Sequence, residues 1–206
     1  HSRLRISSGD SSLAQLEFAD QSDADAGEIR YDNGNDAMTI HVGNNTERLR
    51  IDSNGRVLFS RGGLTASRNV GTKTGEIQVA NSENSSAITI IGYSNSVSGP
   101  YLMFGKSRST NATGSTIVQD GDRLGEIAFC GADGSDIDSF GAAIKCHVDG
   151  TPGANDMPGR LQFYTTSDGG SSSIERLRIK SGGEAHFYGN QTNAPEGDFG
   201  FRWDRN

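Results

Sequence analysis

The chain has 206 residues, of which only 33% are apolar, and it carries 28 glycines and a formal net charge of -7. This balance does not suggest a basic groove for nucleic acid, and no stretch approaches the ~20 apolar residues that a membrane helix needs. This small number of apolar side chains cannot easily offset the conformational entropy that a single chain loses on folding. Because the apolar residues are nevertheless patterned, we expect several copies to share one core, as a homotrimer.

The chain begins with a shortened form of a motif that recurs further on. His1 is followed at once by Ser2-Arg3-Leu4-Arg5-Ile6 and then by a glycine turn. We therefore expect residues 1–10 to be the end of a preceding repeat, and the chain to be a fragment or processed product of a longer protein.

Short alternating or apolar runs follow, and no long stretch places apolar residues at helical spacing. Asn-Gly and Asp-Gly pairs between the runs favour the turns that close hairpins. The sequence therefore predicts an all-β, elongated and fibrous chain of short strands, intertwined as a homotrimer. The expected strands are Leu13–Phe18, Ile29–Tyr31, Met38–Val42, Arg56–Phe59, Ile88–Ile91, Tyr101–Phe104, Gly125–Phe129, Arg160–Tyr164 and His186–Tyr188.

The recurring motif is Glu-Arg-Leu-Arg-Ile followed by a glycine turn, and it stands whole at 47–51 and at 175–179. Successive side chains of a strand point to opposite faces, so Leu and Ile share one face and the two arginines share the other. We expect the apolar face to point to the trimer axis. The core positions of the repeats are then Leu4, Ile6, Leu49, Ile51, Leu177 and Ile179.

The arginines of the motif have two possible roles. They could form forked pairs with carboxylates of a neighbouring chain, such as Glu47, Asp52 or Glu28. Alternatively they are solvated surface residues, each contributing little. The candidates for inter-chain pairing are Arg48, Arg50, Arg176 and Arg178.

A second motif indicates how the chain is organised. Gly-Glu-Ile occurs three times, at 27–29, 75–77 and 125–127. Gly27 lies 20 residues before Glu47, whereas Gly125 lies 50 residues before Glu175. We interpret this as two modules that share a beginning and an end but differ by an insertion. The predicted parts are the preceding repeat at 1–10, module one at 11–60, a connecting β segment at 61–98, module two at 99–189 and an aromatic tail at 190–206.

Few residues suggest a bond or a metal site. Cys130 and Cys146 lie in strand-like runs that could be neighbours, so a disulfide and two buried thiols both remain open. Aspartates cluster at 20–25 and at 133–138. Neither run matches a calcium loop closely, so we interpret both as acidic turns and expect no cofactor.

Glycan cleavage is the one catalytic activity that needs weighing. It would require two carboxylates roughly 5–9 Å apart in a groove. Asp120, Asp122 and Glu126 flank a glycine turn and are better explained as turn and strand-surface residues. We therefore expect no enzyme.

Two stretches of the chain resemble phage tail fibres and related virion appendage proteins. The first runs from Leu13–Phe18 through Gly27–Tyr31 to the motif and turn at 47–55. The second runs from Leu124–Ile127 through the loop and strand at 148–161 to the motif at 175–179, and the two together cover more than half of the chain.

The resemblance implies a homotrimeric β fibre on an extracellular virion, with neighbouring fibre or tail proteins as partners. In that family such repeats often precede a C-terminal intramolecular chaperone. The implied function is structural and adhesive, with attachment to a host-surface glycan or protein. A polysaccharide-degrading tailspike module and a secreted or cell-surface fibre are the alternatives.

Recognition residues are expected where the chain departs from its repeats, because exposed loops on a rigid scaffold often carry binding. The aromatic tail could fill the trimer core, dock on the next fibre segment or contact a receptor. The candidates for receptor or partner contact are Tyr93, Tyr101, Phe199, Phe201, Arg202 and Trp203.

Overall fold

The computed structural model describes residues 2–23, 26–43, 45–61, 66–82 and 86–188. In these ranges the chain forms short strands and no helix, so the prediction of an all-β chain is confirmed. The chain divides into two compact units, His1–Tyr101 and Leu102–Asn206, and each unit contains one main sheet.

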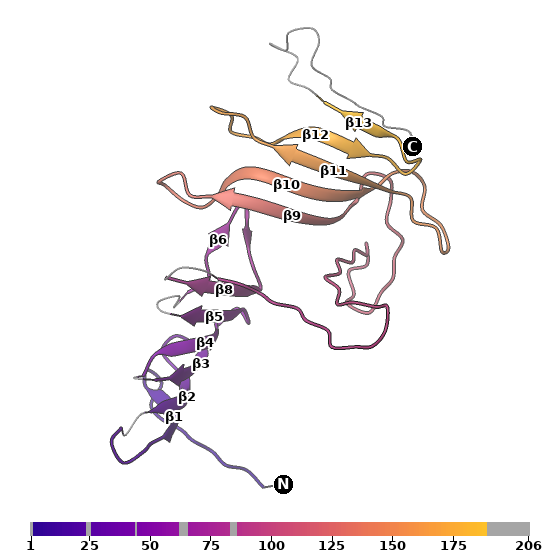
Figure 1. Ribbon diagram of the computed structural model, residues 1–206. Coiled ribbons are helices and arrows are strands. Elements are labelled where there is room, and N and C mark those ends of the chain that lie inside the picture. The colour runs from indigo at the N-terminus through magenta and orange to yellow at the C-terminus, as the bar shows by residue number, and fades with distance from the viewer. Residues whose placement is uncertain (1, 24–25, 44, 62–65, 83–85, 189–206) are drawn as a thin grey trace. The chain divides into compact units, whose positions relative to one another are not determined.

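Sheet one contains six strands (Figure 1). Its first five strands pair antiparallel in chain order, and β8 then pairs parallel with β5. A small pair, β6 (Asn69–Val70) and β7 (Lys73–Thr74), lies in the connection between β5 and β8. The strands of sheet one, in their order in the sheet, are β1 (Leu13–Phe18), β2 (Gly27–Asp32), β3 (Ala37–Val42), β4 (Glu47–Ile51), β5 (Val57–Arg61) and β8 (Ile77–Asn81).

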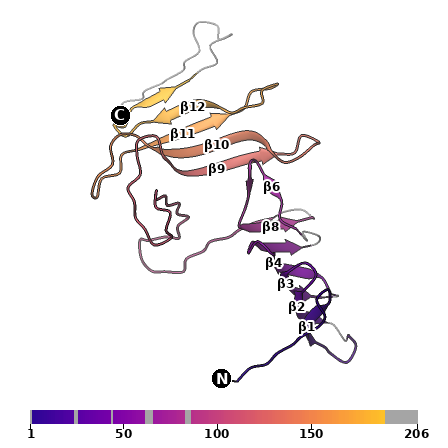
Figure 2. The same ribbon diagram turned by 180° about the vertical axis from the view of Figure 1, so that it is seen from behind.

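Sheet two is an antiparallel meander of five strands. Seen from behind, its strands again lie side by side in chain order (Figure 2). They are β9 (Arg123–Gly131), β10 (Ser139–Val148), β11 (Gly159–Thr165), β12 (Ile174–Ile179) and β13 (Ala185–Phe187).

The two sheets place the arginine motif at the same position, on the fourth strand of a meander. Leu49 lies opposite Phe59 on the fifth strand, as Leu177 lies opposite Phe187. The Gly-Glu-Ile motifs do not correspond in this way, because the first lies on β2 and the third on β9. The two occurrences of Gly-Glu-Ile thus differ in strand position, and the division of the chain into two modules stays a prediction.

The turn after the motif is also the same in both sheets. In sheet one, the Asp52 N–H donates to the Arg56 carbonyl at 3.0 Å and the Gly55 N–H to the Asp52 carbonyl at 2.8 Å. Lys180, Gly183 and Glu184 repeat this pattern in sheet two, with distances of 3.0 and 2.9 Å. The glycine has a φ of 81° in the first turn and 87° in the second, which only glycine adopts readily.

Two expected strands, 88–91 and 101–104, are absent from the described residues, and the shortened motif at 2–6 forms no strand either. In both sheets the motif strand pairs with one neighbouring strand on each side. The described residues before Leu13 contain no strand that could pair with the shortened motif. The expectation for these segments was wrong because a strand depends on a partner as well as on its own pattern.

The apolar core of the single chain is small. In the described residues the buried apolar side chains are Ala37, Leu58, Val118, Ala143 and Val148. Many large apolar residues are instead exposed, and those on the strands of the two main sheets lie mostly on one face of each sheet.

Candidate functional surfaces of the two sheets

The motif strand of sheet one contains a β-bulge. Ile40 on β3 lies opposite Leu49, but the next pair along the strands is His41 with Glu47, which leaves Arg48 without an opposite residue. An extra residue shifts the alternation of side chains by one position. Glu47 therefore shares a face with Arg50 instead of with Leu49.

Sheet two contains the same bulge in its copy of the motif. Phe163 lies opposite Leu177 and Tyr164 lies opposite Glu175, so Arg176 is the extra residue. The bulge thus belongs to the motif itself, and strict alternation along the five residues did not predict it.

The bulge allows a forked ion pair within each motif. Arg50 donates to both carboxylate oxygens of Glu47, at 2.8 and 2.6 Å. Arg178 donates to Glu175 in the same way, at 2.7 and 2.8 Å. Charge-assisted pairs of this two-bond geometry are the stronger class of hydrogen bond. Two of the four candidate arginines thus have a carboxylate partner in their own chain, and pairing between chains stays a prediction.

Around this pair, the polar face of sheet one is arranged in rows across the strands. Arg30, Thr39 and Arg50 lie opposite one another on β2, β3 and β4. The next row places Glu28 and His41 side by side, and Glu28 is ion-paired with Arg30. Long charged side chains cover the shorter ones between them, since Thr39 is only 3% exposed. The hydrogen bond from Arg30 holds the pKa of Glu28 below its ordinary value.

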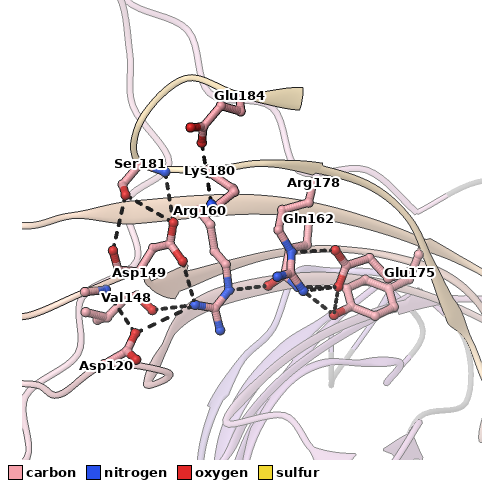
Figure 3. A network of polar contacts seen from close by, with 12 residues as sticks. Asp120, Val148, Asp149, Arg160, Gln162, Glu175, Arg178, Lys180, Ser181 and Glu184 are labelled. Atoms are coloured by element: carbon pink, nitrogen blue, oxygen red, sulfur yellow. Dashed lines mark hydrogen bonds and ion pairs between the residues drawn. The ribbon is translucent and has the colours of Figure 1, made fainter. Parts of the chain in front are cut away.

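The polar face of sheet two carries a denser network (Figure 3). The Gln162 amide is buried and donates to Glu175 at 2.5 Å and to the Tyr164 hydroxyl at 3.0 Å. Burial opposes the charge of Glu175, but the hydrogen bonds from Arg178 and Gln162 outweigh it and lower its pKa. The Lys145 ammonium lies 4.6 Å from the centre of the Tyr164 ring. The network therefore joins β10, β11 and β12.

A second part of this network ties the long loop of sheet two to the turn after the motif (Figure 3). Asp149, just after β10, accepts hydrogen bonds from the Ser181 backbone N–H at 3.0 Å and from its hydroxyl at 3.1 Å. Arg160 donates to Asp149 and to the Val148 carbonyl, at 3.0 and 2.9 Å. The Ser181 backbone bond and Arg160 lower the pKa of Asp149.

The opposite face of each sheet is apolar and open in the single chain. In sheet one, Leu16, Ile29 and Ile40 are neighbours across β1, β2 and β3. In sheet two, Ile127, Ile144 and Phe163 hold the equivalent positions on β9, β10 and β11. The two apolar faces thus carry apolar side chains at equivalent positions. Their exposed members are Leu16, Phe18, Ile29, Tyr31, Met38, Val42, Ile51, Phe59, Ile77 and Val79 in sheet one, and Ile127, Phe129, Leu161, Ile179 and Phe187 in sheet two.

The apolar face of sheet two contains a groove of about 280 Å³ between β9, β10 and β11. Phe104, Gly125, Ile144 and Cys146 are among its lining residues. A Cβ atom on Gly125 would lie 2.8 Å from the Cβ of Phe104, so the glycine allows this aromatic side chain to rest on the sheet.

The remaining residues expected from the sequence lie outside these faces or outside the described residues. Leu4 is 86% exposed and Ile6 is also exposed, whereas Leu49 and Leu177 are half-buried. Tyr93 and Tyr101 are exposed on segments without regular structure. The tail residues Phe199, Phe201, Arg202 and Trp203 lie outside the described residues.

The carboxylates weighed for catalysis each have a structural contact. Asp122 accepts two hydrogen bonds from Arg108, at 2.6 and 2.7 Å, which lower its pKa. Asp120 accepts from the Gly150 N–H at 2.9 Å, and Glu126 is 3.3 Å from the Lys145 ammonium. These contacts join loops and strands, which is a structural use of the charge.

Neither thiol is bonded, and no metal cluster is formed by the described residues. Cys130 lies opposite Phe140, whereas Cys146 lies opposite Gly125, further along the same pair of strands. In the described ranges no group of three or more His, Cys, Asp or Glu side chains could hold a metal ion. The Asp133 carboxylate instead accepts a hydrogen bond from the Ser135 backbone N–H at 2.8 Å, which closes the turn. No described segment forms a helix that could cross a bilayer.

Each sheet thus has one polar face and one exposed apolar face, an arrangement typical of β-meander modules that associate through their apolar faces. No protein-family model and no curated protein sequence matches the chain. Its fold is similar to that of the carboxy-terminal domain of the bacteriophage T5 L-shaped tail fibre, with a TM-score of 0.60 at 15% identity. The match covers 94% of this chain and 79% of that one.

A second structure of the same fibre domain, which includes its intramolecular chaperone domain, is also similar. Its TM-score is 0.59 at 14% identity, and the match covers 94% of this chain but 54% of that chain. At this identity the likeness shows a shared fold.

Proposed function

We propose that the chain is a structural and host-adhesion segment of a phage tail fibre, assembled as a homotrimer on the virion. The observation that carries this proposal is the fold shared with the T5 tail-fibre domain over nearly the whole chain. The motif resemblance to tail fibres, which rests on residues rather than on fold, supports it independently.

The open apolar faces support the homotrimer. Burial of an exposed Ile or Phe side chain stabilises by about 1.5–3 kcal/mol, and each sheet presents several. Three copies that turn these faces to a common axis would share one core and leave the charged networks outside. Three identical binding sites on a stiff rod would then act together on a host surface.

Adhesion without catalysis is the proposed mode of action. The carboxylates of the Asp120–Glu126 region are engaged by Arg108, Lys145 and the loop backbone, which favours a structural use. The partners proposed are neighbouring fibre or tail proteins and a host-surface glycan or protein.

The test begins with light scattering of the purified chain, for which we expect three times the chain mass. The labelled trimer is then incubated with bacterial cells and their purified surface polysaccharides. Binding without release of reducing ends is the expected result. Steady release of reducing ends would favour the tailspike alternative, and a stable monomer would contradict the shared core.

A further inference from the structure

Residues 86–93 have the composition of a strand but do not form one within the chain. Their sequence, Ser-Ala-Ile-Thr-Ile-Ile-Gly-Tyr, is rich in the β-branched and aromatic residues that favour strands. In the described residues, no backbone-to-backbone hydrogen bond joins 86–106 to another part of the chain. This segment therefore has strand-forming side chains and no backbone partner among the described residues.

The side chains of this segment are exposed as well. Ile88 is 75% exposed, Ile90 and Ile91 are at least half exposed, and Tyr93 is 94% exposed. Consecutive exposed apolar residues of this kind mark a surface that associates with another molecule.

The charge pattern indicates which molecule that is. Residues 86–105 contain no charged side chain, although 22% of the whole chain is charged. Identical segments brought together meet no like-charge repulsion, whereas like charges placed opposite each other across strands are destabilising. A short, uncharged segment with high β-propensity and no proline is also the type that pairs with copies of itself. A second copy of this chain is thus the partner that fits.

We propose that residues 86–93 become a β-strand only on assembly, through backbone hydrogen bonds to a neighbouring copy of the chain. Addition of an extended segment to another chain gives affinity through the main chain and specificity through alternate side chains. This inference rests on the proposed homotrimer. It adds that residues 86–93 would obtain their strand partner from another copy of the chain.

The direct test is hydrogen–deuterium exchange on the full chain, with light scattering on the same sample. In the trimer we expect the amides of Ile88–Ile91 to exchange roughly 100-fold more slowly than in an unstructured peptide of the same sequence. Free-peptide exchange in a trimeric sample would overturn the inference while the homotrimer stands. A monomeric sample would overturn both. Protection that appears only after another virion protein is added would overturn the inference too.

Proline substitutions provide a matched pair of variants. Ile90→Pro removes an amide from the proposed strand, and Val97→Pro places the same residue in the exposed bend that follows. We expect the first variant to lose the protection of 88–91 and to lower the melting temperature of the assembly, and the second to change neither. Equal effects of both, or no effect of Ile90→Pro, would contradict the proposed pairing.

Discussion

The forked pair between the glutamate and the second arginine is the residue-scale feature that both sheets share. In sheet two, Glu175 also accepts from the buried Gln162 amide, so its carboxylate has partners on two strands. Removal of one member leaves the other half-buried without its full set of hydrogen bonds, which is destabilising.

Glu175→Gln is expected to reduce the free energy of unfolding by about 1–3 kcal/mol, because it removes the charge that accepts from Arg178. Urea denaturation monitored by circular dichroism measures this change. The matched control is Glu184→Gln, whose side chain is 61% exposed and 3.5 Å from Lys180. We expect the control to change stability by less than about 0.5 kcal/mol, and equal losses would contradict a special role of the fork.

The same carboxylates predict a loss of stability in acid. Hydrogen bonds lower the folded-state pKa of Glu28, Asp149 and Glu175 below their ordinary values of 4.5, 3.8 and 4.5. A carboxyl with a depressed folded pKa contributes stability above its unfolded pKa and loses it as the pH falls through the folded value. Melting temperatures should therefore be constant above about pH 5 and fall below about pH 4.

The acid transition also has an internal control. Glu175→Gln has one fewer titrating group in the network, so its melting temperature should fall less steeply with pH than that of the unsubstituted chain. Parallel curves for the two proteins would assign the acid transition to other groups.

At the scale of the element, the motif is a strand, a bulge and a turn that occur together. The bulge fixes which side chains share a face, and the turn reverses the chain at a glycine with positive φ. The order of the charges across the turn is reversed between the two sheets. In sheet one the acidic Asp52 precedes Arg56, with their charged atoms 3.8 Å apart. In sheet two the basic Lys180 precedes Glu184, with their charged atoms 3.5 Å apart. The turn thus depends on its backbone geometry rather than on the order of the charges.

Gly183→Ala is expected to destabilise the second turn by roughly 1–2 kcal/mol, because a Cβ atom is strained at a φ of 87°. The cost is conformational, since nothing lies within 4 Å of the added atom. Gly131→Ala, at the end of β9, also meets nothing within 4 Å but has an ordinary φ, and should change stability by less than about 0.5 kcal/mol. Thermal melts of the two variants make the comparison.

The sequence predicts most strands because alternation along a strand is a local property. Leu13–Phe18 and the runs that became β3, β9 and β11 follow this pattern and need no knowledge of their partners. The bulges at Arg48 and Arg176 could not be predicted, because a bulge is defined by the register of two strands at once.

The partners of the motif were missed for a related reason. Thr39 and Gln162 are unremarkable in sequence, yet each lies opposite the second arginine of its motif. Their position in the sequence could have identified them. Each is the polar residue between two apolar residues on the strand before the motif. Residues 88–91 form no strand although their pattern is correct, because none of the described residues pairs with them.

The whole molecule presents charge on one face of each sheet and exposed apolar side chains on the other. Adjacent residues of β9 allow a direct test of this asymmetry, because Ala128 and Phe129 are both exposed but point to opposite faces. Phe129→Lys places a charge on the apolar face, and we expect it to convert the proposed trimer to smaller species in light scattering. Ala128→Lys places the same charge on the polar face and should leave the trimer intact.

The outcome of this pair bears on the assembly as a whole. If both variants stay trimeric, the apolar face of sheet two is not the shared surface. If both dissociate, the effect belongs to added charge on β9 rather than to the face that carries it.

The bulge also has a consequence for how modules of this type can change length during evolution. Side chains alternate with a period of two, so loss or gain of one residue within the motif strand would exchange its charged and apolar faces. The connection between the second and third strands of each sheet carries no such constraint. The four residues 33–36 that join β2 to β3 in sheet one are replaced by the longer connection 149–158 between β10 and β11 in sheet two. Insertions and deletions are thus tolerated in this connection, while the motif keeps its five residues and the turn after it keeps its glycine.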